Sequence, residues 1–390
     1  MEKKAKVLIV HNYYQIPGGE DTVVANERAM LERHGHEVLL YSRNNSELKH
    51  FSRFQKLLLP ISTVFNLKTY REVKQIIREN KVDIFHIHNT LNLVSPSVYY
   101  AAFCCKVPVV QTIHNFRLLC PGATFYREGH ICEDCMDEGL GCAVKHACYR
   151  GSRVQTLACV ISTWIHRKLG TYGRLNYICL TEFNKKKLLE LKEVKDSKVF
   201  VKPNFMFEST QSNMIGAKNR NYFIYVGRLD ELKGIRILFE AWKNMGTSAP
   251  KLLVCGTGPL ENWCKSFVQA APECNIELKG FVSNIEAKQL ISKAKALLLP
   301  TQWYEGFPMT IVEAYSVGTP VIGSDMGNVG SLIQDGITGW KFTHDSAEAL
   351  STVVREADRA GFIIDKTKAE RYSMDSNYQQ LMKIYEEVLG

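Results

Sequence analysis

The stretch LLLPTQWYEGFPMTIVEAYSVGTPVIGSD, residues 297–325, decides the fold of this chain. Its apolar start, which ends at Pro300, predicts a buried strand, and a polar loop follows. Pro308 then opens a helical pattern, because proline is tolerated in the first turn of a helix. Gly318 and Pro320 end that pattern. The stretch therefore predicts a strand, a loop and the N-terminus of a helix.

The loop and the start of this helix have the composition of a site for a nucleotide sugar. The backbone N–H groups of residues 307–310 are free at the predicted helix N-terminus, where they and the helix dipole favour an anion. Glu305 and Glu313 lie on either side of them, and two carboxylates cannot bind that anion. We therefore expect both to bind hydroxyl groups attached to the anion. A phosphate joined to polyols indicates a nucleotide sugar.

The rest of the chain alternates apolar runs with helical patterns, which predicts parallel sheets covered on both faces. A helix is expected over residues 22–33, and the same rhythm restarts in the second half. Ligands of such sheets bind beyond the carboxyl ends of the strands. In the first half, strands are expected at residues 7–10, 37–43, 83–89, 107–115, 177–182 and 198–204.

A chain of 390 residues is long enough for two cores. The apolar pattern lapses at residues 206–220, which we interpret as an interdomain linker. We predict an α/β protein with two doubly wound, Rossmann-like domains, at residues 1–206 and 221–368. A helical pattern in residues 369–390 is expected to cross back to the first domain.

The excess of basic over acidic residues lies entirely in the first half of the chain. Residues 1–200 hold 29 Lys and Arg against 19 Asp and Glu, whereas the remainder holds 20 against 21. This excess indicates either a solvated surface or a face turned towards anionic lipid or a phosphate-bearing acceptor. Nucleic acid is disfavoured, because no recognised binding motif accompanies the charge.

Two further patterns bear on location. No signal peptide precedes the first apolar strand, so a cytoplasmic protein in a reducing compartment is expected. The longest uncharged stretch, residues 84–105, is broken by histidines, asparagines and a proline, and we therefore do not expect it to span a membrane.

Other ligands of doubly wound folds leave signatures that this sequence lacks. A nicotinamide dehydrogenase needs G-x-G-x-x-G after a strand and an acid about 20 residues later. The first loop has only Gly18-Gly19, and the second strand ends at Arg43 without an acid. A P-loop is missing, which disfavours ATP hydrolysis. No D-x-D pair occurs in the sequence, so we expect no catalytic metal.

Two cations follow a predicted strand in VGRLDELKG, residues 226–234. One loop could bring Arg228 and Lys233 to the same diphosphate. The alternative is an ordinary surface cluster, in which Asp230 and Glu231 pair with them. The nearby pair of glutamates favours the diphosphate.

The motifs taken together resemble one enzyme family over essentially the whole chain. They are Gly18-Gly19, TIHN at 112–115, VGRLDELKG at 226–234, CGTGP at 255–259 and EGFPMTIVE at 305–313. Their order and spacing resemble the GT-B glycosyltransferases, specifically the retaining family 4. That resemblance implies two domains facing a central cleft, with the acceptor bound by the first and the nucleotide sugar by the second.

The resemblance also implies roles for individual donor-site residues. Glu305 would contact the hydroxyls of the transferred sugar and Glu313 the ribose, while Arg228 and Lys233 would hold the diphosphate. The implied donor set is Gly18, Gly19, Arg228, Lys233, Gly256, Gly258, Glu305, Gly306, Phe307, Pro308, Met309, Thr310 and Glu313.

His114 is the implied catalytic residue of the first domain. Its carbonyl or ring would help stabilise the positive anomeric centre; the alternative is a strand-end histidine satisfied by its neighbours. His88, Asn115 and Arg117 are expected on the acceptor side. Such enzymes have no agreed protein nucleophile, so catalysis would rest on Arg228, Lys233 and Glu305 stabilising and positioning the reacting groups.

The activity implied by the resemblance is retaining hexosyl transfer. The donor would be a UDP-sugar rather than a GDP-sugar. The acceptor would be a saccharide or lipid-linked saccharide in bacterial surface polysaccharide or glycan synthesis. Two alternatives are another nucleotide-sugar enzyme of this fold, such as a phosphorylase or an epimerase, and a non-catalytic zinc-containing scaffold.

A cysteine-rich insertion at residues 116–151 predicts a structural Zn²⁺. Cys132-x-x-Cys135 has the spacing of a tetrahedral zinc site, and Cys120 and Cys148 flank it. Disulfides and unligated thiols are the alternatives, and a reducing compartment disfavours the disulfides. Cys142, His130 or His146 could replace one of the four ligands. The segment HNFRLLCP…C-x-x-C…CYRGS resembles one found in a subset of family 4 enzymes.

Two stretches of the first half mix basic and large apolar residues, at residues 48–65 and 152–170. Interfacial helices have this composition, but so does a buried helix with a basic outer face. Together with the charge asymmetry, they predict a peripheral protein on the inner face of the cytoplasmic membrane.

Overall fold

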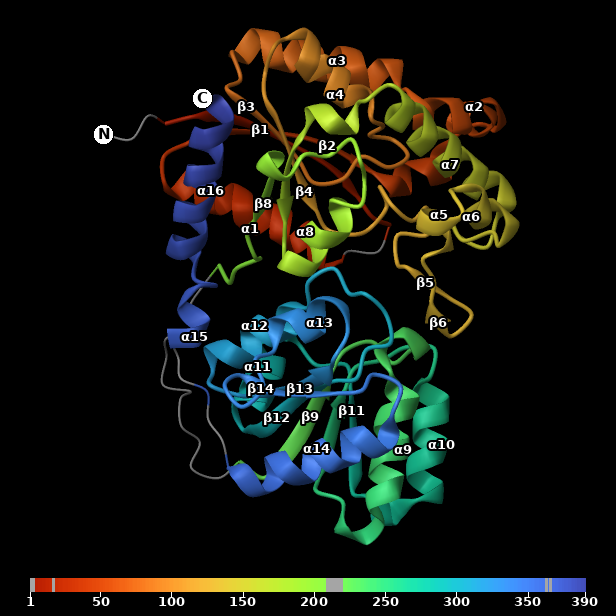
Figure 1. Ribbon diagram of the computed structural model, residues 1–390, viewed down its shortest axis with the longest axis vertical. Coiled ribbons are helices and arrows are strands. Elements are labelled where there is room, and N and C mark those ends of the chain that lie inside the picture. Colours follow the sequence, from red (N-terminus) through yellow and green to blue (C-terminus); the bar gives the residue numbers. More distant parts are fainter. Residues whose placement is uncertain (1–3, 16–17, 208–219, 362–363, 365–366) are drawn as a thin grey trace. The chain divides into compact units, whose positions relative to one another are not determined.

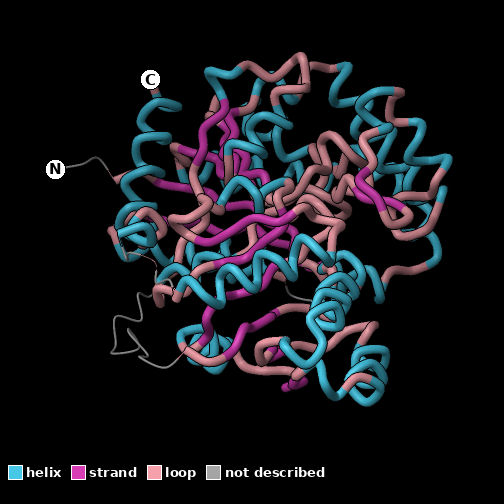
Figure 2. The backbone as a smooth tube through the Cα atoms, turned by 60° about the horizontal axis from the view of Figure 1, so that its bottom comes forward, coloured by secondary structure: helices cyan, strands magenta, loops and turns pink. Residues whose placement is uncertain are grey.

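The computed structural model describes residues 4–15, 18–207, 220–361, 364 and 367–390. The chain divides into two compact units. Unit 1 comprises Met1–Phe125, Cys132–Phe207 and Met374–Gly390, and unit 2 comprises Tyr126–Ile131 and Glu208–Ser373. In each unit strands lie inside and helices surround them (Figure 2).

Unit 1 is built on a six-stranded parallel sheet with the order β2-β1-β3-β4-β7-β8. Its central strands are continuous apolar runs, such as residues 7–10, which are buried because helices cover both faces. The strands are β1 (Lys6–Tyr13), β2 (Glu37–Asn44), β3 (Ile84–Ile87), β4 (Val109–Ile113), β7 (Asn176–Cys179) and β8 (Val199–Val201).

The helices of unit 1 follow the strands in alternation (Figure 1). The long ones are α1 (Gly19–Arg33), α2 (Arg53–Val64), α3 (Leu67–Asn80), α4 (Ser97–Cys104), α7 (Arg153–Lys168) and α16 (Met374–Leu389). The short ones are α5 (Asp134–Asp137), α6 (Gly141–Lys145) and α8 (Glu182–Leu188). The short strands β5 (Tyr126–Arg127) and β6 (His130–Ile131) form a separate hairpin.

The last helix, α16, is part of the core of unit 1. Tyr378, Leu381 and Ile384 pack with β1 and α1 residues in one hydrophobic cluster. The hydroxyl group of Tyr378 lies 2.9 Å from His36 Nε2. The segment that belongs to unit 1 begins at Met374, five residues later than the boundary expected from the helical pattern.

Unit 2 has its own six-stranded parallel sheet, in the order β11-β10-β9-β12-β13-β14. The order reverses between β9 and β12, and ligands of doubly wound sheets bind at such a switch point. The strands are β9 (Tyr222–Val226), β10 (Leu252–Cys255), β11 (Ile276–Gly280), β12 (Ala294–Leu299), β13 (Val321–Ser324) and β14 (Gly339–Phe342).

Helices α9 and α14 contact each other over the sheet of unit 2 and share its main core, which includes the fully buried Trp242. The helices are α9 (Ile235–Met245), α10 (Glu261–Ala270), α11 (Asn284–Ser292), α12 (Met309–Ser316), α13 (Gly327–Leu332), α14 (Ala347–Ala360) and α15 (Thr367–Glu370).

Two sequence-based boundaries compare with the structure as follows. Most of the expected linker, residues 208–219, lies outside the described residues. The expected assignment of all of residues 116–151 to the first domain is wrong at Tyr126–Ile131, which groups with unit 2. A two-stranded hairpin has no core of its own, so its sequence gives no sign of the unit that it joins. None of the described helices is long and apolar enough to cross a membrane.

Candidate active site

In unit 2, the loops after β9, β10 and β12 lie against one another beyond the carboxyl ends of their strands. Leu229 N–H donates to the carbonyl of Thr257 (3.0 Å), and Gln302 N–H donates to the loop after β9 (2.8 Å). Gly256 has a φ of +140°, and a Cβ on Gly258 would lie 2.4 Å from the Leu229 carbonyl oxygen. The GTGP glycines thus allow the close packing of the loops that carry Arg228, Lys233 and Glu305.

Lys233 and Glu305 form an ion pair at the switch point of this sheet. Lys233 Nζ lies 2.7 Å and 2.8 Å from the two carboxylate oxygens of Glu305. Glu305 is buried, and Asn328 Nδ2 donates to the carbonyl oxygens of Glu305 and Gly306, which holds the loop in place. The Lys233 side chain is 28% exposed, so part of it faces solvent.

Arg228, the second expected cation, has a different environment. Its Nε lies 2.9 Å from Asp230 Oδ2, and its side chain is 67% exposed. Glu231 pairs with Arg236 instead, at 2.8 Å. The alternative of a surface charge cluster therefore describes Arg228, whereas Lys233 pairs with Glu305 rather than with Asp230 or Glu231.

Helix α12 begins at Met309, directly after the loop that carries Glu305. Pro308 precedes it with a φ of −73°, and the expected anion-binding residues 307–310 form the end of the loop and the start of the first helical turn. The first N–H groups of a helix have no acceptor within it. Glu313 lies one turn further on. Burial raises the pKa of Glu313, while Lys288 lowers it.

In unit 1, three histidines lie near the carboxyl ends of β1, β3 and β4. His88 Nδ1 lies 2.9 Å from His114 Nε2, and the ring of His11 lies 6.4 Å from that of His88. Burial, followed by the neighbouring His88 and His11 rings, holds the pKa of His114 well below its ordinary value. The His114 ring is therefore neutral near pH 7, with one N–H donor and one acceptor nitrogen.

A buried carboxylate beneath these histidines was not identified from the sequence. Glu27 Oε1 lies 3.4 Å from His88 Nε2 and 3.1 Å from His86 Nδ1, and Glu27 Oε2 accepts from Lys202 Nζ at 3.0 Å. Burial alone would raise the pKa of Glu27, but Lys202 and both histidines lower it well below its ordinary value. Lys202 Nζ also donates to Asn377 of α16 at 2.9 Å.

The ligand atoms of Glu27, His86 and His88 lie within 4.8 Å of one another, a spacing that could hold a metal ion. The ammonium group of Lys202 already lies 3.0 Å from Glu27, and a second cation there would be repelled. We therefore interpret the three side chains as a charge-balanced network.

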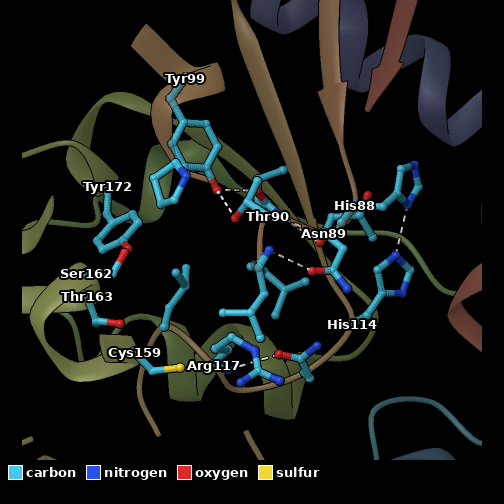
Figure 3. A pocket seen from close by; sticks show the side chains of 17 residues that line it. His88, Asn89, Thr90, Tyr99, His114, Arg117, Cys159, Ser162, Thr163 and Tyr172 are labelled. Carbon is cyan, nitrogen blue, oxygen red and sulfur yellow. Dashed lines mark hydrogen bonds between the residues drawn. The ribbon is translucent and has the colours of Figure 1, made fainter. Parts of the chain in front are cut away.

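A small cavity of about 60 Å³ lies beside the histidines, within unit 1. Its wall includes His88, His114, Asn115 and Arg117, the residues expected to act on the acceptor side. Asn115 Oδ1 accepts from Arg117 N–H at 3.1 Å. Figure 3 shows the two histidines on one side of the cavity. The other side is formed by residues that the sequence analysis missed, namely Cys159, Ser162 and Thr163 of α7 and Tyr172.

The expected Gly18-Gly19 pair lies at the start of α1. Gly18 N–H donates to Asp21 Oδ2 at 3.0 Å, and a Cβ on either glycine would meet no atom within 4 Å. Internal packing among the described residues therefore does not require glycine here. The next residue, Glu20, accepts from the Tyr14 hydroxyl at 3.0 Å, and burial raises the pKa of Glu20 to about 8.

The insertion brings several thiols near one another. Burial, followed by Cys120, Cys148 and Cys142, raises the pKa of Cys135 to about 12. None of the cysteines that the structure describes forms a disulfide. Within the described part of the chain, however, no three cysteine Sγ atoms lie within 4.8 Å of one another. Cys142, which could replace one of the four expected ligands, is one of the thiols that interact with Cys135, and it donates to Glu138 Oε2 at 3.5 Å.

Comparisons with known proteins agree with the division of the chain into two units. Residues 17–206 match the family Glycosyltransferase Family 4, and residues 208–371 match Glycosyl transferases group 1. The amylovoran biosynthesis glycosyltransferase AmsK of Erwinia amylovora is 28% identical over 176 residues, which cover 41% of this chain and 43% of AmsK.

Two solved structures share the fold over nearly the whole chain. The lipopolysaccharide outer core galactosyltransferase WaaB matches with a TM-score of 0.68 at 16% identity, covering 97% of this chain and 98% of WaaB. Anabaena HepE in complex with UDP-glucose matches with a TM-score of 0.63 at 16% identity, with the same coverage. The expected GT-B fold is confirmed, with two parallel-sheet α/β domains.

Proposed function

Since its two halves match the Glycosyltransferase Family 4 and Glycosyl transferases group 1 families, we propose that this chain is a retaining glycosyltransferase. It transfers a sugar from a nucleoside diphosphate sugar to a saccharide or lipid-linked saccharide, in the synthesis of a bacterial surface polysaccharide. The observation that carries this proposal is the Lys233–Glu305 ion pair at the switch point, since Glu305 lies in the loop that leads directly into the N-terminus of α12. AmsK is named for amylovoran biosynthesis and WaaB for the lipopolysaccharide outer core, and these names support a saccharide or lipid-linked saccharide as the acceptor.

The proposed donor site uses each group for what its charge allows. Lys233 and the first turn of α12 bind the diphosphate, and Arg228 adds a second, more exposed cation. Glu305 accepts hydrogen bonds from hydroxyls of the sugar, and Glu313 does so from those of the ribose. We propose UDP as the nucleotide, with GDP as the alternative, because HepE of the same fold binds UDP-glucose.

The proposed chemistry depends on electrostatic stabilisation. Lys233 and the helix N-terminus stabilise the negative charge that develops on the departing diphosphate. No Asp-x-Asp pair occurs in the sequence, so we propose that departure needs no carboxylate-held Mg²⁺. In unit 1, a neutral His114 can offer its acceptor nitrogen or its backbone carbonyl to a positive anomeric centre. The cavity beside it, with Arg117, is assigned to the acceptor.

Turnover with defined donors tests the proposal. We expect UDP-sugars to raise the melting temperature of the full chain more than GDP-sugars, since only a ligand of the folded state stabilises it. Product analysis with a saccharide acceptor should show a new glycosidic bond with the anomeric configuration of the donor. Sugar phosphate as the product would indicate a phosphorylase, and an isomerised donor would indicate an epimerase. Inverted products would contradict the retaining mechanism.

We also propose that the insertion binds a structural Zn²⁺ through Cys120, Cys132, Cys135 and Cys148, or with Cys142 replacing one of them. The interaction of the buried Cys135 thiol with those of Cys120, Cys148 and Cys142 supports this, because a cation would relieve the cost of ionising them. Zinc bound there would supply folding energy to a segment with a core of only a few residues.

Metal analysis of protein purified without chelator should find close to one zinc per chain. Cys135→Ser should lose the zinc and lower the melting temperature, whereas Cys104→Ser, at an exposed thiol outside the insertion, should do neither. Substoichiometric zinc in the wild type, together with unchanged stability in strong chelator, would remove the metal from the proposal.

A further inference from the structure

Helix α2 carries its apolar residues on its exposed side. Phe54, Leu57, Leu58 and Ile61 recur at the helical spacing of one stripe, and Leu57 is 74% exposed. Thr63, near the end of the helix, is its one fully buried residue among those described. An ordinary amphipathic surface helix has the opposite arrangement, with its apolar stripe against the core.

Helix α7 is inverted in the same way. Its buried residues are mainly polar, whereas Val154, Leu157, Ile161 and Trp164 are exposed, the last by 55%. Hydrogen bonds explain this orientation at the end of the helix, where His166 Nε2 lies 3.0 Å from the carbonyl oxygen of Val64. The inward face of α7 is thus fixed by polar contacts, and its apolar face is left for solvent.

The two helices pack against each other in unit 1 (Figure 1), so the two stripes are neighbours on one surface. We call this surface the α2–α7 face. Monomeric proteins rarely expose large contiguous apolar patches without a binding function. The exposed apolar residues of the face and its borders are Phe54, Leu57, Leu58, Ile61, Phe65, Leu67, Val154, Leu157, Ile161, Trp164 and Leu169.

The two segments that carry the α2–α7 face have charges of one sign. Residues 48–71 and 139–181 contain no Asp or Glu at all. Exposed bases border the stripes, namely Lys49, Arg53, Lys56, Arg153 and Lys168. A second copy of the chain fits this face poorly, because a two-fold axis would bring its bases together without acids to neutralise them. An apolar surface with a basic border matches the surface of an anionic bilayer.

We propose that the α2–α7 face binds an anionic lipid membrane, with the apolar stripes inserted among the lipids and the bases at the head groups. The inward face of α7 supplies Cys159, Ser162 and Thr163 to the cavity that also contains His114 and Arg117 (Figure 3). One helix therefore connects the membrane surface with the proposed acceptor cavity. This favours an acceptor attached to a lipid, a conclusion that rests on the proposed function, whereas membrane binding itself does not.

Vesicle sedimentation of the full chain at physiological salt tests the proposal. Binding to vesicles of phosphatidylglycerol and phosphatidylcholine is expected, and binding to phosphatidylcholine alone should be much weaker. Lys56→Gln with Arg153→Gln should weaken binding to the anionic vesicles about 30-fold, since each base near such a surface contributes about a fivefold effect. Leu57→Asp with Trp164→Asp should abolish it. Phe281→Asp, at a residue 80% exposed in unit 2, should leave it unchanged.

Two outcomes would overturn the proposal. One is a wild type that stays with the supernatant at every lipid composition. The other is a loss of self-association in the Leu57→Asp, Trp164→Asp variant without any vesicle binding by the wild type, which would assign the face to a second copy. Transfer to a water-soluble saccharide acceptor should be the same in this variant and in the wild type. If that transfer is absent from both, the proposed function fails independently of the membrane result.

Discussion

Replacing Lys233 with Ala should lower kcat/KM for sugar transfer by about 100-fold to 1,000-fold, the usual effect of losing one preorganised group that stabilises transition-state charge. Lys233 is the cation that the fold holds against Glu305 at the switch point, with part of its side chain exposed to solvent. The loss should fall mainly on kcat, because the charge on the departing diphosphate grows during the reaction.

The controls for this variant lie on the same segment. Arg236 lies three residues after Lys233, is exposed and pairs with Glu231. Arg236→Ala should therefore leave transfer unchanged. Lys233→Ala also leaves the buried Glu305 unpaired, so its melting temperature must be compared with that of Lys233→Ala, Glu305→Gln. A folded Lys233→Ala variant that transfers sugar at the wild-type rate would refute the donor-site assignment. Arg228→Ala tests the exposed cation separately.

Glu27→Gln should lower the free energy of unfolding by about 3–5 kcal/mol, the usual cost of breaking a buried ion pair from one side. Lys202 is buried, and Glu27 is the carboxylate that balances it. The double variant Glu27→Gln, Lys202→Met removes both charges and should recover much of that loss. Glu32→Gln, which breaks an exposed pair with Arg28 on the same helix, should cost less than about 1 kcal/mol. Urea unfolding of the four proteins provides the comparison.

The pH dependence of this cluster has a definite sign. Burial lowers the pKa of His86 from 6.5 to about 3, although Glu27 opposes this and His88 and Lys202 add to it, and burial lowers the pKa of His11 to about 4. Both groups take up protons more readily when unfolded. Their contribution to the free energy of unfolding is therefore complete above pH 6.5 and is lost as the pH falls towards 4. The lowered pKa of Glu27 changes the stability in the same direction. Glu20, whose pKa burial raises to about 8, acts in the opposite direction, so the measurement is made on Glu20→Gln protein. In that variant, stability that rises on acidification from pH 6.5 would contradict the network.

Glu27→Gln also tests whether the network orients His114. Glu27 Oε1 lies 3.4 Å from His88 Nε2, and its charge favours the His88 tautomer that carries the proton on Nε2. In that tautomer His88 Nδ1 accepts from His114 Nε2, and the Nδ1 of His114 is left as an acceptor. A Gln side chain at position 27 can donate to His88 Nε2 and reverse this order. Nitrogen-15 NMR of the histidine rings should show the change of tautomer, which a purely structural effect on stability would not produce.

Much of the fold follows from the sequence because strands and helices alternate with clear periods. The stretch at residues 297–325 predicts its strand, loop and helix, and the structure has β12, the loop and α12 there. Lys233 and Glu305 could be placed together because both follow strands at one edge of a parallel sheet. Their direct contact could not be predicted, since Asp230 and Glu231 are nearer in the sequence.

Other features depend on tertiary packing that local patterns do not encode. Glu27 lies in mid-helix with no distinguishing neighbours, and its role depends on Lys202, 175 residues away. The stripes of α2 and α7 have the same period whether they face the core or the solvent, so the sequence left a buried and an exposed orientation open. Polar contacts such as that between His166 and Val64 decide for exposure.

The position of α16 has a consequence for the order of events on the ribosome. Unit 1 contains the first residues to be synthesised, yet its hydrophobic cluster includes Tyr378 and Leu381, and its buried Lys202 needs Asn377. Domains generally fold as units in the order of their synthesis. Here the intervening unit 2 leaves the ribosome complete before unit 1 can close. Translation that stops short of residue 374 would therefore yield a chain with a complete unit 2 and an incomplete unit 1, which proteases can recognise and remove.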